Sequence, residues 1–358
     1  MDLKEKYGFT FPVSSMITAR PNFHYVREPV FRRMPDGSLF SVGLSGGLME
    51  PANENVVVAV QSYDDGQTWT LPRVLFRHSE RAVWATELFT EGPRPLLFVH
   101  TYHAASQYRE IHTYVSTTRD SGKTWTQPQS LPCGIANVVV RQGIVLQNGR
   151  WVFPVYWQEG RSQWDWGQET EKRFWPKLCG VMVSDDQGTH FQQHGWVRSS
   201  QYDLWENNVV ELEPNHLMML MRAEYAGYLY RTDSYDGGLH WGPAHQTEIP
   251  NPNSKVSLCK VGDAVVLAHN PNHYTGPTMW PPRTPLSLWV SLNGAKTWAK
   301  KIDLCIKGRF MFYPHLMWDD DRKLLYIACE NGDEHFLMKL SYDTILAGID
   351  KADGGTHA

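Results

Sequence analysis

Five copies of one eight-residue pattern constrain the fold more strongly than any other feature of this 358-residue chain. The pattern is Ser or Thr, any residue, Asp, any residue, Gly, two variable residues and an aromatic residue. Its copies are Ser62–Trp69, Thr118–Trp125, Ser184–Phe191, Ser234–Trp241 and Ser291–Trp298. The last copy is degenerate, because Asn293 and Ala295 replace the Asp and the Gly. Successive copies begin 56, 66, 50 and 57 residues apart, and periods of this size are typical of propeller blades or solenoid units.

The pattern has the chemistry of a hairpin turn rather than of a reactive site. Asp and Gly tolerate left-handed backbone angles, and an Asp side chain accepts nearby backbone N–H groups. The aromatic residue can then pack into its own sheet. A β-rich run such as Asn55–Gln61 precedes each copy, and turn signals such as Met34–Gly37 separate other strand pairs. No helical period is sustained, so the sequence predicts an all-β fold.

Composition excludes several classes of partner and site. The net charge is −4, and the 34 basic and 38 acidic residues are interspersed, so there is no basic stripe for nucleic acid. The five cysteines are scattered without metal or redox spacing and are expected to be buried reduced thiols. No apolar run reaches the roughly 18 residues of a membrane span, and the first residues form no leader-like apolar region. We therefore expect a cytoplasmic protein without membrane contact, although a secreted protein trimmed of its leader would look the same at this end.

These repeats are Asp-boxes, and their number and spacing resemble those of the sialidase (neuraminidase) superfamily, the BNR-repeat propellers, over essentially the whole chain. The resemblance implies a six-bladed β-propeller with four-stranded antiparallel blades. Five blades would carry a box, and residues 303–345 would form a final blade without one. We expect residues 1–358 to form a single domain, with a strand from before the first blade closing the ring.

Five positions match family motifs in chain order. Val26–Phe31 resembles the family's Arg-Ile-Pro motif, with Arg27 in place and Glu28 where the family has Ile. Trp205–Leu212, which contains Glu206, is similar to a family strand that reads Asn-Glu-x-x-Val-Val-Glu-Leu. The remaining matches are Arg222 at the end of the next strand, Arg283 ahead of the fifth box, and Tyr313 at the opening of the last blade.

The resemblance implies a role for each of these residues. Arg27, Arg222 and Arg283 would bind a substrate carboxylate, because planar guanidinium groups match carboxylates in charge and geometry. Tyr313 would be the nucleophile at the anomeric carbon and Glu206 would accept its proton, since sialidases use a tyrosine in place of a carboxylate. The implied activity is that of an exo-acting glycoside hydrolase that releases a terminal acidic sugar, sialic acid or a related ulosonic acid, with retention and without a cofactor.

One departure concerns the general acid. The family places an Asp in the loop between the second and third strands of the first blade, whereas residues 46–55 contain none. Glu50 is nearest by spacing and Glu54 is the other candidate, and either could donate a proton if its pKa were raised. Glu28 would add a negative charge beside the arginines unless strand alternation turns it into the blade.

Other blades supply further candidates for the central funnel. They are His103 with Tyr102 in one loop, Trp84 and Glu87 at the start of an inner strand, the aromatic insertion from Trp157 to Trp175, and His273 with Trp280 beside Arg283. We expect His103, Trp84 and His273 to contact the substrate. The aromatic side chains suit stacking on sugar faces, and packing between blades is an equal alternative. No metal site is expected, because the histidines lack ligand spacing.

Two other functions remain open at the level of sequence. A lyase for uronic-acid oligosaccharides, or an unusual rhamnosidase, would use a histidine or tyrosine for proton transfer and arginine to neutralise a carboxylate. The histidines considered for that role are His100, His103, His112, His273 and His315. A non-catalytic carbohydrate-binding propeller would keep the aromatic residues but would have little use for a Tyr–Glu pair beside three arginines. Fold resemblance alone does not separate these functions.

Overall fold

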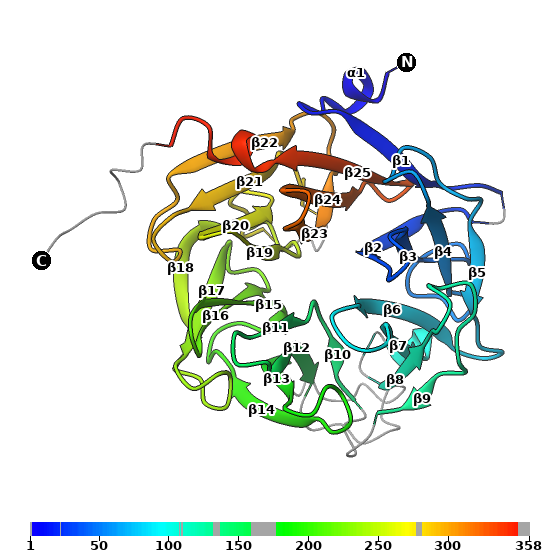
Figure 1. Cartoon of the computed structure of the whole chain (residues 1–358), viewed down its shortest axis with the longest axis horizontal. Coiled ribbons are helices and arrows are strands. Elements are labelled where there is room, and N and C mark those ends of the chain that lie inside the picture. The colour runs from blue at the N-terminus through cyan, green and yellow to red at the C-terminus, as the bar shows by residue number, and fades with distance from the viewer. Residues whose placement is uncertain are drawn as a thin grey trace, which may run out of the picture.

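The computed structural model forms a ring of six antiparallel sheets around a central axis (Figure 1). It describes residues 2–21, 23–106, 108, 110–131, 137–158, 177–276 and 281–349. The predicted six-bladed β-propeller is confirmed. Five sheets have four strands, and the third carries a short additional strand. The aromatic insertion beyond Gln158 and the candidate Trp280 lie outside the described residues.

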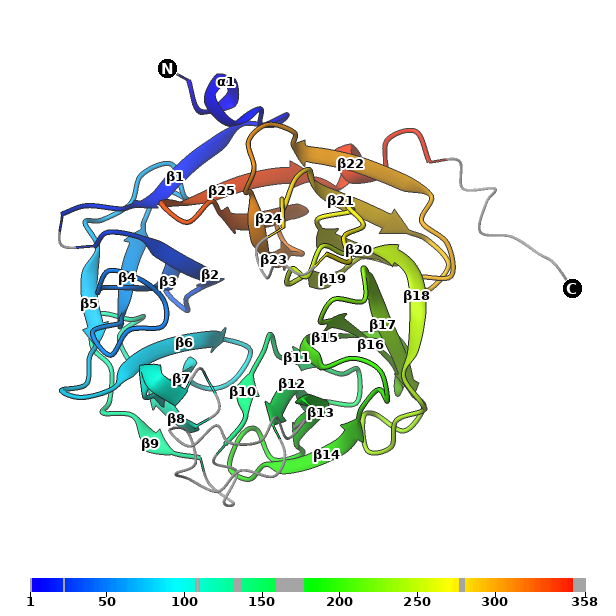
Figure 2. The same cartoon turned by 180° about the vertical axis from the view of Figure 1, so that it is seen from behind.

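Each blade runs from an inner strand at the axis to an outer strand at the rim (Figures 1 and 2). Blades one and two comprise β2 (Val26–Arg33), β3 (Leu39–Ser45), β4 (Val56–Ser62), β5 (Arg73–Phe76), β6 (Ala82–Phe89), β7 (Leu96–Tyr102), β8 (Ile111–Thr117) and β9 (Gln129–Ser130). Blades three and four comprise β10 (Val139–Val140), β11 (Ile144–Val145), β12 (Trp151–Gln158), β13 (Lys177–Ser184), β14 (Gln192–Val197), β15 (Leu204–Glu213), β16 (His216–Ala223), β17 (Tyr228–Ser234) and β18 (His245–Pro250). Blades five and six comprise β19 (Ser257–Val261), β20 (Ala264–His269), β21 (Leu286–Ser291), β22 (Lys300–Cys305), β23 (Phe312–Asp319), β24 (Leu324–Glu330), β25 (Glu334–Ser341) and β1 (Val13–Thr18).

The sixth blade combines the two ends of the described chain. β1 pairs antiparallel with β25, from Val13 opposite Met338 to Thr18 opposite Glu334. In both views β1 lies along the rim beside β25, next to the start of blade one (Figures 1 and 2). The pairing covers the outer edge of β25 and leaves β1 as the outer strand of this blade.

Helices are short and peripheral. α1 (Leu3–Tyr7) precedes β1, a 3₁₀ turn at Ala104–Ser106 follows β7, and α2 (Tyr342–Leu346) follows β25. In the part of the chain that the structure describes, no helix is long and apolar enough to cross a membrane. The described cysteines are free thiols, three of them buried and Cys259 partly so, and Cys133 lies outside the described residues.

Each Asp-box forms the turn between the third and fourth strands of its blade. In the first box the Ser62 hydroxyl accepts the Gly66 N–H at 2.7 Å, and the Asp64 carboxylate accepts the Thr68 N–H at 2.8 Å. These hydrogen bonds, those with Thr68 foremost, lower the pKa of Asp64 to about 2. The degenerate fifth box keeps the geometry, because Asn293 accepts the Thr297 N–H at 3.0 Å and Ala295 takes a left-handed φ of 58°.

The core lies between neighbouring blades rather than at the axis. Blades one and two, for example, pack Val30 and Val57 against Val83 and Leu97, all fully or almost fully buried. Comparable apolar clusters join the other blade pairs. Since the apolar side chains pack between the blades, polar side chains can occupy the axis, and the inner strands supply several of them, such as Glu28 and Glu206.

Candidate active site

Three inner strands contain a β-bulge that aims one residue at the axis. Glu28 in β2, Glu206 in β15 and Tyr313 in β23 have left-handed φ angles of 55°, 47° and 51°, and the pairing register of each strand shifts at that point. Such angles cost a residue with a Cβ about 1–3 kcal/mol each and are concentrated at functional sites, and a bulge redirects a side chain. Glu28 contacts Lys255 and Arg141, and Tyr313 contacts Arg222, so that both residues meet side chains from non-adjacent blades, which can happen only near the ring centre.

Arg222 joins Glu206 to Tyr313. Its Nη1 donates to Glu206 Oε2 at 2.7 Å and to the Tyr313 hydroxyl at 3.2 Å, while its Nε donates to Asn253 Oδ1 at 2.8 Å. The guanidinium carbon also lies 4.1 Å from the ring centroid of Trp205. Because the planar guanidinium group of Arg222 has several fixed contacts, it can hold the Glu206 carboxylate and the Tyr313 hydroxyl in a defined position relative to each other.

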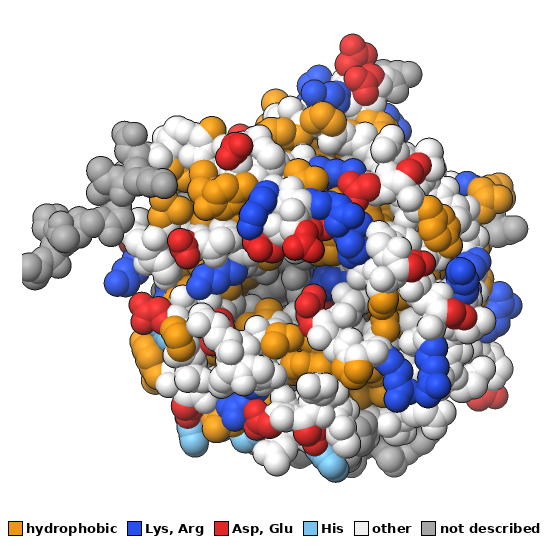
Figure 3. Space-filling view, viewed as in Figure 1, with side chains coloured by type: hydrophobic (Ala, Val, Ile, Leu, Met, Phe, Trp, Pro, Cys, Tyr) orange, Lys and Arg blue, Asp and Glu red, His pale blue; other side chains and the backbone are white. Residues whose placement is uncertain are grey.

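The other two predicted arginines both lie over the ring of Phe312, and Arg283 also lies over that of Tyr313. The Arg283 guanidinium carbon lies 5.0 Å from the Phe312 centroid and 5.1 Å from the Tyr313 centroid, and Nη2 donates to the Asn253 carbonyl at 2.8 Å. The Arg27 guanidinium carbon lies 5.3 Å from the Phe312 centroid. The structure therefore brings the three arginines to one place. Figure 3 shows a hollow near the centre of one face, bordered by Lys, Arg, Asp and Glu side chains.

The charges at this place oppose proton transfer in the ligand-free protein. Burial, together with the Glu206 carboxylate, raises the pKa of Tyr313 to about 12. Burial would also raise the pKa of Glu206, but the Arg222 and Arg141 guanidinium groups outweigh it and hold that pKa below its usual value. Glu206 is thus a carboxylate next to a neutral phenol.

Glu50 lies beside Arg27. Its Oε2 is 3.7 Å from Arg27 Nε, and its Oε1 accepts the Tyr108 hydroxyl at 2.8 Å. Burial raises the pKa of Glu50 despite the opposing charge of Arg27. A raised pKa is what a general acid near neutral pH needs.

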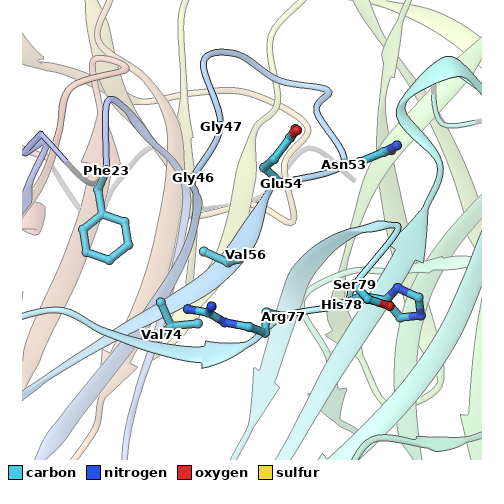
Figure 4. Close-up of a pocket in the computed structure, with 10 residues that line it drawn as sticks. All are labelled: Phe23, Gly46, Gly47, Asn53, Glu54, Val56, Val74, Arg77, His78 and Ser79. Atoms are coloured by element: carbon cyan, nitrogen blue, oxygen red, sulfur yellow. The ribbon is translucent and has the colours of Figure 1, made fainter.

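Glu54, the other candidate acid, points to a different space. It is exposed and lines a cavity of about 360 Å³ together with Phe23, Arg77 and His78 (Figure 4). This cavity is not lined by Glu206, by Tyr313 or by any of the three predicted arginines, Arg27, Arg222 and Arg283. The geometry therefore favours Glu50 over Glu54, although both belong to the same loop.

The remaining predicted contacts, Trp84, His103 and His273, have other printed partners than the three arginines. Trp84 is only 4% exposed, and it packs against Tyr102 and Tyr108 rather than offering a free face. His103 lies at the loop that carries Glu50, with Nε2 3.1 Å from Asn53 Nδ2. His273 is exposed and its ring centroid is 4.7 Å from that of Tyr228 in blade four. Trp84 thus supports Tyr108, which in turn holds Glu50.

The other charged candidates are either structural or peripheral. Glu87 is fully buried and binds Arg32 at 3.0 Å. Among the histidines, His315 is in contact with Arg32 and His100 with Thr86, while His112 pairs with Glu110 at the surface. Burial lowers the pKa of His100 to about 3 and also that of His315 well below its usual value.

Sequence reasoning missed three buried residues of the site. Arg141 interrupts the apolar run Val138–Val140 of an inner strand, so the rule that singled out Glu206 would also have found it. Lys255 lies two residues before the inner strand β19, and Glu330 ends the apolar strand β24. Glu330 accepts the Glu28 N–H at 2.8 Å and lies 3.5 Å from Arg27, and burial raises its pKa to about 7.

Comparison with known proteins agrees with this architecture. A curated sialidase from Bacteroides fragilis is 23% identical over 252 residues, which are 66% of this chain and 42% of that protein. The chain thus spans less than half of that relative. Among solved structures, the Hadza microbial sialidase Hz136 superposes with a TM-score of 0.71 at 17% identity, covering 89% of this chain and 66% of the other. The NanB sialidase from Streptococcus pneumoniae gives a TM-score of 0.70 at 12% identity, covering 96% and 73%.

The family model described as "BNR repeat-like domain" matches residues 44–327. That range begins in the first blade, includes all five boxes and ends in the sixth blade. The chain belongs to the BNR repeat-like domain family and has the sialidase-type propeller fold.

Proposed function

We propose that the protein is an exo-acting, retaining glycosidase that releases a terminal acidic sugar of the ulosonic acid class, such as sialic acid. The observation that carries the proposal is the contact of one guanidinium group, that of Arg222, with both Glu206 and the Tyr313 hydroxyl. The approach of Arg27 and Arg283 to the same rings supports a carboxylate ligand, because guanidinium groups bind carboxylates with high geometric specificity.

Substrate binding supplies the change that proton transfer needs. A sugar carboxylate bound to the three arginines offsets their positive charge near Glu206. The pKa of Glu206 then rises, because the interaction that held it down is weakened. Glu206 can now accept the proton of the Tyr313 hydroxyl, so that the base and the nucleophile become active only when an acidic sugar is present.

The two chemical steps follow from this arrangement. In the first, the Tyr313 oxygen attacks the anomeric carbon, the bond to the leaving group breaks, and Glu50 gives its proton to the departing oxygen. In the second, the Glu50 carboxylate takes a proton from water, the water oxygen replaces the tyrosine, and Glu206 returns the proton to Tyr313. Two displacements at one carbon give net retention.

Hydrolysis of a fluorogenic sialoside tests the proposal, with the deaminated analogue and a Kdo glycoside as parallel substrates. We expect turnover of at least one of these substrates and its loss in Tyr313→Phe. Proton NMR of the first-formed sugar should give the same anomer as the substrate. A rise in ultraviolet absorbance from an unsaturated uronide, without release of any ulosonic acid, would replace the proposal with a lyase. Binding without turnover of any of these sugars would also refute it.

The described histidines do not favour the lyase. His100 and His315 are buried with strongly lowered pKa values, and His112 pairs at the surface with Glu110. His103 and His273 lie on different blades, at the loop of Glu50 and beside Tyr228 respectively. No pair of them is placed beside the three arginines as an acid and a base would be.

A further inference from the structure

A buried ionic cluster without an assigned role lies next to Tyr313. Lys255 Nζ donates to Glu28 Oε2 at 2.7 Å, and Arg141 Nη2 lies 3.5 Å from the same oxygen. All three side chains are at least nine-tenths buried. Arg141 Nη1 has no hydrogen-bond partner among the described residues. The cluster thus contains two cations and one anion, and it carries a net positive charge into the interior.

The cluster is directed at the nucleophile rather than at the periphery. Lys255 Nζ lies 4.9 Å from the ring centroid of Tyr313. Glu28 is presented by a left-handed bulge of the same kind as those that present Glu206 and Tyr313. A structural ion pair does not require this strained backbone, whose cost is expected where a side chain must be aimed.

Other charged groups surround the Tyr313 ring and Lys255. From the strands and loops packed against them, these are Arg27 from β2, Glu206 from β15, Arg222 from β16, Arg283 from the loop before β21, His315 from β23 and His335 from β25. Burial and the charge of Arg141 lower the pKa of Lys255, while the nearby Glu28 carboxylate opposes them.

Arg27, Arg222 and Arg283, together called the arginine clamp, cannot fully stabilise the ionised phenol of Tyr313 while they also bind a substrate carboxylate. In the ligand-free protein, Arg222 and Arg283 both act to lower the pKa of Tyr313. A bound carboxylate offsets part of this effect at the moment when the phenol must ionise. Lys255 and Arg141 are paired with Glu28, so their excess charge remains available when the arginine clamp is occupied.

We propose that Lys255, held in place by Glu28 and Arg141, is a positioning residue that stabilises the ionised form of Tyr313 while the arginine clamp is occupied. The inference rests on the proposed function, in which that oxygen is the nucleophile and later the leaving group. The proton of Tyr313 still goes to Glu206, and Lys255 keeps its own protons throughout. Lys255 therefore acts through Tyr313 and does not itself react with the sugar.

The direct test measures the ionisation of residue 313 in the full chain without substrate. A difluorotyrosine incorporated at position 313 titrates at lower pH than tyrosine and is observed by ¹⁹F NMR. We expect Lys255→Met to raise the pKa of this residue, with its ionisation constant falling by about tenfold or more. Glu28→Gln should change it in the opposite direction, because removing the carboxylate leaves two uncompensated cations. A merely structural role predicts no such opposite shifts.

The chain offers a matched control and a second variant. Lys339 is also paired with a carboxylate, Asp65 at 2.8 Å, and its Nζ lies 5.6 Å from the ring centroid of Tyr326; Lys339→Met should leave residue 313 unchanged. Arg141→Met removes the other cation of the cluster and should act in the same direction as Lys255→Met. If Lys255→Met does not fold, the ionisation of residue 313 is measured in Arg141→Met instead.

Activity provides a separate readout. With natural Tyr313, Lys255→Met should lower kcat about tenfold or more with little change in KM, and Lys255→Arg should restore part of the loss. Unchanged ionisation in both cation variants, or shifts of the same sign in these and in Glu28→Gln, would overturn the inference even if sialosides are hydrolysed. If the pKa of residue 313 shifts in opposite directions in the cation variants and in Glu28→Gln, but no acidic sugar is hydrolysed, the proposed function is refuted and the effect of Lys255 on ionisation still holds.

Discussion

Glu28, Glu206 and Tyr313 occupy a backbone conformation that residues with a Cβ avoid, and all three point into the same network of arginines and lysine. The network is built so that each buried carboxylate has a cation within reach. Glu206 has Arg222 at 2.7 Å and Glu28 has Lys255 at 2.7 Å. At the scale of single residues, stability and function are therefore coupled, because removing one partner leaves an uncompensated buried charge.

Arg222→Met should destabilise the protein by about 3–5 kcal/mol at neutral pH, since it leaves the Glu206 carboxylate buried without its main partner. The folded-state pKa of Glu206 is lowered in the parent protein, so its contribution to stability is present above the unfolded-state pKa and is lost as the pH falls through the folded value. Urea unfolding at several pH values checks this. The difference between variant and parent should shrink in acid, and a difference that grows in acid would contradict the assignment.

Glu50→Gln should reduce the hydrolysis of natural glycosides by about 10²–10⁴-fold and should affect substrates with an activated leaving group much less. A general acid works only when protonated, so activity in the parent falls as the pH rises through the raised pKa of Glu50. In the variant this alkaline limb of the kcat/KM profile should disappear. Glu54→Gln is the matched control from the same loop, and an equal loss in that variant would show that the acid is misassigned.

The Asp-box is an element that holds a turn by hydrogen bonds around one side chain. The same contacts recur in four blades with Asp and in the fifth with Asn293, which shows that the geometry needs an acceptor at this position rather than a charge. The carboxylate adds a pH-dependent contribution, since the pKa values of Asp64, Asp120, Asp186 and Asp236 are all lowered to about 2 by these hydrogen bonds.

Asp64→Asn separates the charge from the turn. Because the folded-state pKa of Asp64 is lowered, the carboxylate stabilises the protein above the ordinary pKa of about 3.9 and loses that effect as the pH falls toward 2. Unfolding of the variant should therefore differ from that of the parent at neutral pH and approach it near pH 2. Thermal unfolding followed by circular dichroism measures both. A difference independent of pH would indicate that only shape matters at this turn.

The propeller fold could be predicted from sequence because its boxes are local and repeated, whereas parts of the site could not. Arg27, Glu206, Arg222, Arg283 and Tyr313 were found through short motifs, and the structure brings them together. Glu28 was ambiguous because strand alternation does not reveal a bulge. Lys255 and Arg141 meet Glu28 from blades that lie far apart in the chain. Trp84 is predicted to line the funnel, but Tyr102 and Tyr108 cover its ring. The sequence does not reveal these contacts, because the two tyrosines come from the next strand and the loop beyond it.

At the scale of the whole molecule, the ring depends on the pairing of β1 with β25. Met16 and Ile17 of β1 are almost fully buried in the apolar cluster between blades six and one. Without β1, β25 would present an unpaired edge, which natural β-proteins avoid. Closure of the ring is therefore a property of a few residues that lie outside the repeated pattern.

Ile17→Ala should cost about 2–5 kcal/mol, as expected for a large buried aliphatic residue. Hydrogen exchange followed by mass spectrometry should show faster exchange in β25 than in the strands of blades three and four, because the opening is local. Val13→Ala is the matched control, since Val13 lies in the same strand but is only partly buried. Equal effects of the two variants on β25 would contradict a role for Ile17 in closing the ring.

The pairing of β1 with β25 also sets an order of events during synthesis. The sheet that β1 completes is the one whose inner strand presents Tyr313, and its other strands are synthesised after those of the other five blades. Until β25 has been made, β1 lacks its pairing partner and the sixth blade remains incomplete, although the earlier blades are already present. A chain that stops before β25 thus lacks the strand with which β1 pairs, and the ring is left open between blades six and one.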